Sequence, residues 1–139
     1  MINYIKSPVF GDFRDWCEKE FVQLERVIQP FVEVANDGRI PIREITTTTY
    51  TLALADERYL LKCTHASGCT VTVPPNSTAA FVAGSVIHIA QWGTAQVTVA
   101  AGSGVTVRSS LTLKTRALYA PVTLLKMDTN EWLLFGERE

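Results

Sequence analysis

The spacing of hydrophobic and polar positions changes once along the chain, near residue 45. Before this point, large apolar side chains recur at steps of three and four residues, which is the spacing of one face of an α-helix. This stripe consists of Phe13, Cys17, Phe21, Leu24, Ile28 and Phe31. Gly11-Asp12 supplies an N-cap, and Pro30 stops the helix because proline has no amide hydrogen. The pattern therefore predicts an amphipathic helix over about residues 12–29.

After residue 45 the pattern alternates with a period of two, as in strands that bury one face. Turn-forming residues separate the short β-branched runs. The expected strands are 46–55, 59–64, 69–73, 86–91, 96–100, 105–108, 111–114, 121–127 and 131–135. Short strands at this spacing predict a compact antiparallel β-sandwich or barrel-like domain, so the chain is expected to be mainly β.

The tripeptide Val-Thr-Val occurs three times, at 71–73, 97–99 and 105–107. The intervals of 26 and 8 residues are unequal, which argues against a solenoid repeat. The last two copies flank Gly102-Ser103-Gly104, and this arrangement predicts a β-hairpin over residues 97–107.

These patterns divide the chain into three parts. Residues 1–34 hold an arm and the amphipathic helix, residues 35–45 form a linker, and residues 46–139 form the β-domain. A single helix of this length is only marginally stable alone, so it must dock on another surface. The candidate residues for attachment or oligomerisation are Phe13, Phe21, Leu24, Ile28 and Phe31. The alternative is that the helix caps the β-domain of its own chain.

The charges are balanced in number but uneven in position. Thirteen Lys and Arg against fourteen Asp and Glu give a net charge of −1, so we expect no nucleic-acid partner that is held by phosphate neutralisation. The 45 residues from 63 to 107 contain no Asp, Glu, Lys or Arg. Either Thr, Ser, Gln and Asn keep this surface polar, or copies of the chain or a larger assembly cover it. We favour the second explanation.

The sequence shows no feature of a membrane or exported protein. No apolar run approaches the roughly 20 residues that a membrane span requires. The first residues, Met-Ile-Asn-Tyr-Ile-Lys, lack the charged-then-apolar order of a signal peptide. We therefore expect no membrane partner and a chain that is not exported.

Groups for catalysis or metal binding are sparse. Cys63, His65 and Cys69 lack the paired cysteine spacing of structural zinc sites and have no evident fourth ligand. His88 lies in an alternating strand pattern, as an ordinary strand residue does. We predict no enzymatic activity, no catalytic residues, no metal and no cofactor. Cys17, Cys63 and Cys69 are expected to be reduced and packed, although a Cys63–Cys69 bridge is the alternative.

Three aromatic residues of the predicted β-domain are candidates for ligand stacking. Trp92 precedes a tight turn, Trp132 begins the last predicted strand, and Tyr119 precedes a strand. Such rings either stack on a sugar ring or fill the end of the β-fold. For both tryptophans we favour the second role.

One long segment resembles a small β-domain of tailed-bacteriophage structural proteins. It includes Thr70-Val-Thr-Val-Pro-Pro-Asn-Ser-Thr78, Ala79-Ala-Phe-Val-Ala-Gly-Ser-Val-Ile-His-Ile-Ala-Gln91, Ala101-Gly-Ser-Gly-Val-Thr-Val107 and Asp128-Thr-Asn-Glu-Trp-Leu-Leu-Phe-Gly136. The resemblance covers about residues 47–137. Such domains occur in tail-fibre and in head- or tail-decoration chains, often as homotrimers. Cys63, Cys69 and the segment Arg116-Ala-Leu-Tyr119 depart from the pattern.

The resemblance implies a virion structural protein, made in the host cytoplasm, that serves as a fibre, a decoration or a tail or neck accessory component. Its expected partners are itself, as a homotrimer, and other proteins of the capsid, neck or tail. The alternative is a carbohydrate- or receptor-binding module of a phage adsorption apparatus, in which Trp92, Tyr119 or Trp132 stacks on a host-surface glycan. A glycan depolymerase or esterase is disfavoured because Ser, His and Asp match no nucleophile elbow.

Overall fold

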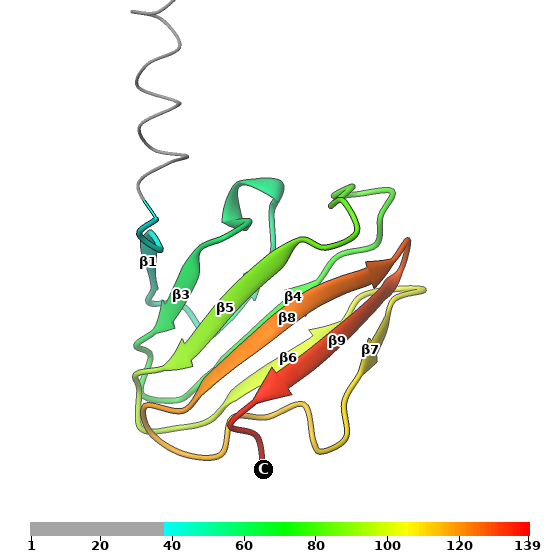
Figure 1. Cartoon of the computed structure of the whole chain (residues 1–139). Helices are drawn as coiled ribbons and strands as arrows, with labels where there is room; N and C mark the ends of the chain where they lie inside the picture. Colours follow the sequence, from blue (N-terminus) through cyan, green and yellow to red (C-terminus); the bar gives the residue numbers. More distant parts are fainter. Residues whose placement is uncertain (1–37) are drawn as a thin grey trace, which may run out of the picture. The chain divides into compact units, whose positions relative to one another are not determined.

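The part of the chain that the computed structural model describes, residues 38–139, contains nine strands in two sheets (Figure 1). They are β1 (Ile42–Ile45), β2 (Thr49–Thr51), β3 (Leu60–Cys63), β4 (Cys69–Val73), β5 (Val86–Gln91), β6 (Val97–Ala101), β7 (Thr106–Arg108), β8 (Pro121–Asp128) and β9 (Glu131–Gly136). Sheet A has six strands in the order β1-β3-β5-β8-β9-β7. Sheet B has three strands in the order β2-β4-β6. Residues 40–139 form one unit, which we call the β-domain.

The chain passes alternately from sheet A to sheet B, so that β1–β2, β3–β4 and β5–β6 form three successive coils. Neighbouring coils pair in parallel in both sheets. Leu60 pairs with His88 in sheet A, and Cys69 pairs with Val97 in sheet B. Both pairs are 28 residues apart, so the second and third coils stack in one common register. The arrangement is solenoid-like, so the prediction against a solenoid from the unequal Val-Thr-Val intervals is wrong.

The prediction of a mainly β domain is confirmed, but the prediction of an antiparallel sandwich is wrong. Among the described strands, only the β5–β8 and β8–β9 pairs are antiparallel. A period of two shows which face of a strand is buried, but it does not identify the neighbouring strand. The connections 64–68 and 92–96 lead the chain into the other sheet instead of back along the same one.

The predicted hairpin over residues 97–107 is also wrong. β6 lies in sheet B, whereas β7 lies in sheet A and pairs in parallel with β9. Gly102 makes this change of sheet possible, because a Cβ there would lie 2.6 Å from the carbonyl oxygen of Val73. The turn Gly102-Ser103-Gly104 thus joins two sheets instead of two paired strands.

Several elements of the structure have bounds that differ from the predicted ones. Ile42–Ile45, which we assigned to the linker, form β1 at the edge of sheet A. The predicted strand 46–55 contains only β2, followed by the short 3-10 helix η2 (Leu54–Asp56). Residues 111–114 form no strand and contribute one isolated bridge, from Lys114 to Thr98. No helix within residues 38–139 is long and apolar enough to span a membrane.

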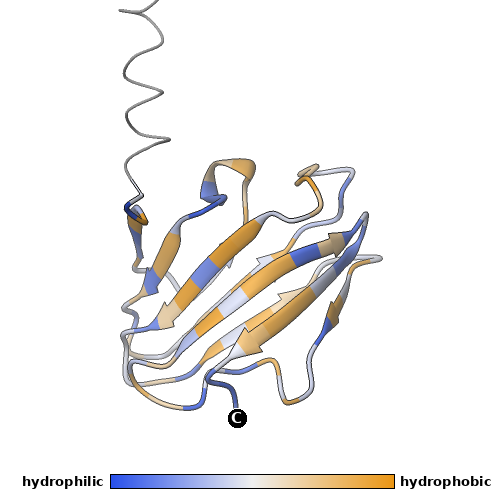
Figure 2. Ribbon diagram, viewed as in Figure 1, coloured by the Kyte–Doolittle hydropathy of each residue, from blue (hydrophilic) through white to orange (hydrophobic). Residues whose placement is uncertain are grey.

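Alternate residues of both sheets are buried and fill one shared core. Figure 2 shows the hydrophobic residues of these strands in orange. Valines of β4 and β6 face strands of sheet A. The largest fully buried side chains are Trp132, Leu61, Ile87, Ile89, Leu124, Leu134, Gln91, Val71, Val73, Val97, Val99 and Val122. Within residues 38–139, every buried side-chain nitrogen and oxygen has a hydrogen-bond partner.

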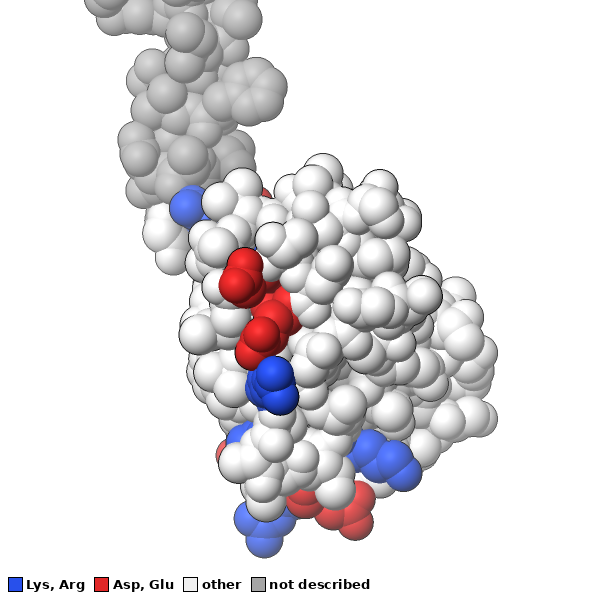
Figure 3. All heavy atoms as spheres, turned by 90° about the vertical axis from the view of Figure 1, so that its right-hand side faces the viewer, with Lys and Arg blue, Asp and Glu red and all other residues white. Residues whose placement is uncertain are grey.

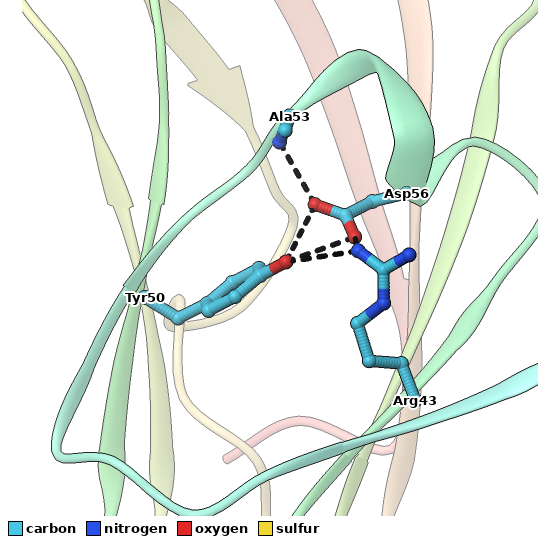
Figure 4. A network of polar contacts seen from close by, with 4 residues as sticks. All are labelled: Arg43, Tyr50, Ala53 and Asp56. Atoms are coloured by element: carbon cyan, nitrogen blue, oxygen red, sulfur yellow. Dashed lines mark hydrogen bonds and ion pairs between the residues drawn. The ribbon is translucent and has the colours of Figure 1, made fainter.

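A buried carboxylate closes the first coil (Figure 4). Asp56 is fully buried, and its carboxylate accepts hydrogen bonds from the Tyr50 hydroxyl at 2.9 and 3.0 Å and from the Ala53 amide at 2.8 Å. Arg43 of β1 pairs with the same carboxylate. Burial raises the pKa of the Tyr50 hydroxyl, so the hydroxyl remains a donor to Asp56 at neutral pH. The network ties β1, β2 and η2 together.

The two described cysteines lie where one coil turns from sheet A into sheet B. Cys63 ends β3 and Cys69 begins β4, and both are buried free thiols. The alternative of a Cys63–Cys69 bridge is therefore not realised. Burial raises the pKa of both thiols, so both are protonated at neutral pH.

Replacing Asp56 with Asn should weaken the first coil. The Asp56→Asn side chain keeps its size but loses the charged acceptor, and hydrogen bonds to charged groups contribute about 1.5–3 kcal/mol. We expect urea unfolding to show a loss of this size. Glu44→Gln is the matched control, since Glu44 is an exposed carboxylate on β1 and its neutralisation should change stability little. Equal losses in the two variants would contradict a structural role for the network.

The buried thiols should make the β-domain less stable at alkaline pH. An unfolded cysteine ionises near pH 8.5, whereas Cys63 and Cys69 keep their protons to higher pH in the folded state. The unfolded state therefore binds fewer protons above that pH, and stability falls by up to about 1.4 kcal/mol per pH unit for each thiol. Urea unfolding at pH 7.5, 8.5 and 9.5 measures this slope. A Cys63→Ala/Cys69→Ala variant should show a clearly flatter slope, and an unchanged slope would refute the explanation.

Candidate functional site

Two of the three predicted stacking residues meet on the surface of the β-domain. The ring centroids of Trp92 and Tyr119 lie 5.0 Å apart, and their planes form an angle of 71°. This edge-to-face arrangement is one that aromatic pairs prefer. Trp92 is 48% exposed and Tyr119 is 61% exposed, so both rings also present area to solvent. We call this pair the aromatic corner.

The end of β5 fixes the backbone of Trp92. The amides of Trp92 and Gly93 both donate to the carbonyl oxygen of Cys63, at 2.7 and 2.9 Å. A Cβ at position 93 would overlap the carbonyl oxygen of His65, so this close approach of two coils requires glycine. The backbone that carries the Trp92 ring is therefore packed directly on the preceding coil.

Tyr119 is held in an unusual backbone conformation. Its φ of 70° lies in the left-handed region, which is unfavourable for a bulky side chain. The Tyr119 amide donates to the carbonyl oxygen of Gln91 at 2.8 Å, and the Gln91 amide donates to that of Ala120 at 3.1 Å. Ala120 is buried at the start of β8, which prevents the segment from relaxing freely. The surrounding structure thus imposes the conformation that places the Tyr119 ring beside Trp92.

A buried amide connects both sides of the aromatic corner. The Gln91 side chain donates to the carbonyl oxygen of Gly93 at 3.1 Å, and its Oε1 accepts a hydrogen bond from the hydroxyl of Thr115. Thr115 is also buried and accepts a hydrogen bond from the Val97 amide at 2.9 Å. These bonds join the end of β5, the start of β6 and the segment before β8. The corner therefore stands on a fully hydrogen-bonded support.

One charged side chain, Lys62, lies beside the corner on the outer face of sheet A, and a second, Glu44, lies one strand further away. The Lys62 ammonium lies 5.1 Å from the centroid of the Trp92 ring, within the range of a cation–π contact. Glu44 is the neighbour of Lys62 in the β1–β3 register and lies on the same face. Neither side chain forms an ion pair with a residue of the described range 38–139. The site therefore offers a hydrogen-bond donor beside the Trp92 ring and an acceptor on the neighbouring strand.

Trp132, the third stacking candidate, belongs to the core. It is 1% exposed and packs edge-to-face on Phe81, with centroids 5.3 Å apart. The buried ammonium of Lys126 lies 5.7 Å from its centroid and donates to Asn76 at 2.6 Å. Loss of hydration on burial lowers the pKa of Lys126. Trp132 is thus unavailable to a ligand, as the core-filling interpretation predicts.

The candidate attachment residues Phe13, Phe21, Leu24, Ile28 and Phe31 lie outside the described residues, as does Cys17. Within residues 38–139, no group of three or more His, Cys, Asp or Glu side chains is placed to hold a metal ion. His65 accepts from the Ser67 amide at 3.1 Å, and His88 lies 3.0 Å from the Thr123 hydroxyl. Both histidines therefore have local partners.

Sequence reasoning missed the residues that support or flank the corner: Glu44, Lys62, Gln91, Gly93 and Thr115. The sequence gives one indication of Lys62, because it is the charged position of an otherwise apolar strand. The sequence gives no indication of Gln91 and Thr115, since they are 24 positions apart and pair only in the folded chain. Comparison with family models, curated proteins and solved structures finds no match to this chain.

Proposed function

We propose that the chain is a non-enzymatic structural protein of a tailed-phage virion, assembled as a homotrimer. In this proposal residues 1–34 attach the chain to a capsid, neck or tail protein, and the β-domain is displayed as a fibre, decoration or accessory component. The resemblance over residues 47–137 supports this proposal, because it extends over strands β2 to β9 of the β-domain. The observation that carries it is the outer face of sheet A.

Five of the six strands of this face carry outward apolar side chains. The register places its outward side chains in adjoining rows, and the row that crosses five strands is Ile42, Leu60, His88, Thr123 and Phe135. A second row contains Val86, Leu125 and Leu133. Ile42 is 65% exposed, Met127 52% and Phe135 44%. Half-buried Leu60, Leu125 and Leu133 lie between these exposed residues, His88 and Thr123 interrupt the first row, and Arg108 ends the second. Apolar side chains gathered on one face in this way favour a surface that another protein covers.

The outer face of sheet B has a different character. Thr49, Thr70 and Thr98 lie side by side across its three strands, and Thr51 lies next to Thr72. These hydroxyl rows account for the missing charges on sheet B without any partner. In Figure 3 the charged side chains are confined to a few places, with broad uncharged areas between them. We therefore assign contacts between copies to the two rows of sheet A that begin at Ile42 and Val86, whereas the row of Glu44, Lys62 and Ala90 lies outside this contact.

A charge placed on sheet A should break the trimer. In the full chain, light scattering after size exclusion at micromolar concentration should give the mass of three copies. Phe135→Glu should give a monomer, because the new carboxylate would lose its hydration in the contact. Thr72→Glu, on the outer face of sheet B, is the matched control and should remain trimeric. A wild-type monomer, or a trimeric Phe135→Glu variant, would contradict the assignment.

Deletion of residues 1–34 should separate attachment from folding. The stripe of large apolar residues can supply a specific contact, because burial of each such side chain contributes about 1.5–3 kcal/mol. We expect the shortened chain to keep its melting temperature and to be missing from purified particles that contain the full chain. If the helix instead caps the β-domain, the shortened chain should melt early. Early melting, or incorporation of the shortened chain, overturns the attachment role.

A further inference from the structure

The aromatic corner formed by Trp92 and Tyr119 is a built surface feature with no role in the core. We propose that the corner, together with Lys62 and Glu44, binds an uncharged pyranose glycan. The proposal concerns ligand binding by the β-domain and does not depend on the place of the chain in a virion.

The geometry of the two rings fits a sugar ring. Their planes form an angle of 71°, and each ring remains about half exposed or more. A pyranose can lie with its C–H face on one ring while its edge contacts the other. The faces of aromatic rings carry negative potential, which attracts the weakly positive C–H groups of a sugar. Single exposed aromatic residues are common on protein surfaces, but two in fixed mutual contact offer a shaped site.

The backbone conformation of Tyr119 is the second observation. A left-handed φ is retained at a bulky residue only where the surroundings enforce it, and such residues cluster at functional sites. Here the bond from the Tyr119 amide to Gln91 and the buried side chains of Gln91 and Thr115 enforce it. The rings are therefore ordered before a ligand arrives, which lowers the entropic cost of binding.

The charges beside the corner define the class of sugar. Lys62 donates hydrogen bonds and Glu44 accepts them, and the two are neighbours in the β1–β3 register without forming an ion pair. Sugar hydroxyls both donate and accept, so a neutral glycan satisfies both side chains. A carboxylated sugar would meet the Glu44 carboxylate, and a cationic sugar would meet the Lys62 ammonium. The pair thus favours an uncharged ligand.

The test uses the full chain and an array of neutral oligosaccharides of glucose, galactose and N-acetylglucosamine, with sialylated and uronic-acid glycans as the charged set. We expect binding to members of the neutral set, with a shift of the Trp92 indole resonance on titration. Trp92→Ala and Tyr119→Gly should each weaken binding about tenfold or more, the loss expected for one stacking ring. Glycine at position 119 tolerates the positive φ, so this variant removes the ring without adding strain.

Val82→Ala is the matched control, because Val82 is an exposed apolar residue in the connection before β5 and belongs to neither sheet. It should leave the dissociation constant within about twofold, while all three variants keep the wild-type melting temperature. Incorporation of Trp92→Ala into particles is measured separately, so failure of glycan binding and failure of the virion role give different results.

The proposal is overturned by binding only to the charged set, by no binding at millimolar sugar, or by full binding of Trp92→Ala. Loss of self-association in Trp92→Ala would likewise overturn it, since the corner would then be a contact between copies.

Discussion

Stacking of the second and third coils depends on one backbone register that serves both sheets at once. The 28-residue spacing between Leu60 and His88 recurs between Cys69 and Val97. Any shift in one sheet would have to be matched in the other, and a shift by one residue would turn the core side chains outward. Small residues permit the close approach of coils at their turns, as Gly93 does against the carbonyl oxygen of His65. This register determines where the core, the outer faces and the aromatic corner lie.

The two ends of the stack are closed by different means. At the first coil, Asp56 contacts Arg43, Tyr50 and the Ala53 amide, and these hydrogen bonds hold the short strands β1 and β2 of the two sheets together. Beyond the third coil, the antiparallel pair β8–β9 extends sheet A and brings Trp132 into the core. β7 then pairs in parallel with β9 as the last strand of the sheet. Both edge strands of sheet A are short, which limits pairing with foreign strands.

The sequence pattern predicts individual strands well because alternation depends on each strand alone. β4 has the predicted bounds, and Trp132 is buried as its core-filling interpretation requires. The pattern does not predict which strands pair, because pairing depends on the register between strands. Identical Val-Thr-Val copies suggest an interval of 26 residues, whereas the pairing of Cys69 with Val97 gives 28. A slide of two residues keeps valine on the inner face, so the two alignments look equally good in the sequence.

The same dependence on strand pairing explains why the sequence predicted the two residues of the aromatic corner but not their contact. Trp92 and Tyr119 are recognisable as aromatic residues near turns, but their contact depends on the pairing of β5 with β8. That pairing sets Gln91 beside Ala120 and leaves Tyr119 with a positive φ. The strain is maintained by parts of the fold that are themselves fully hydrogen-bonded, and a structural role alone does not require an exposed ring there. Coil stacking thus supplies a hydrogen-bonded base, on which the two rings are held in contact with each other and exposed to solvent.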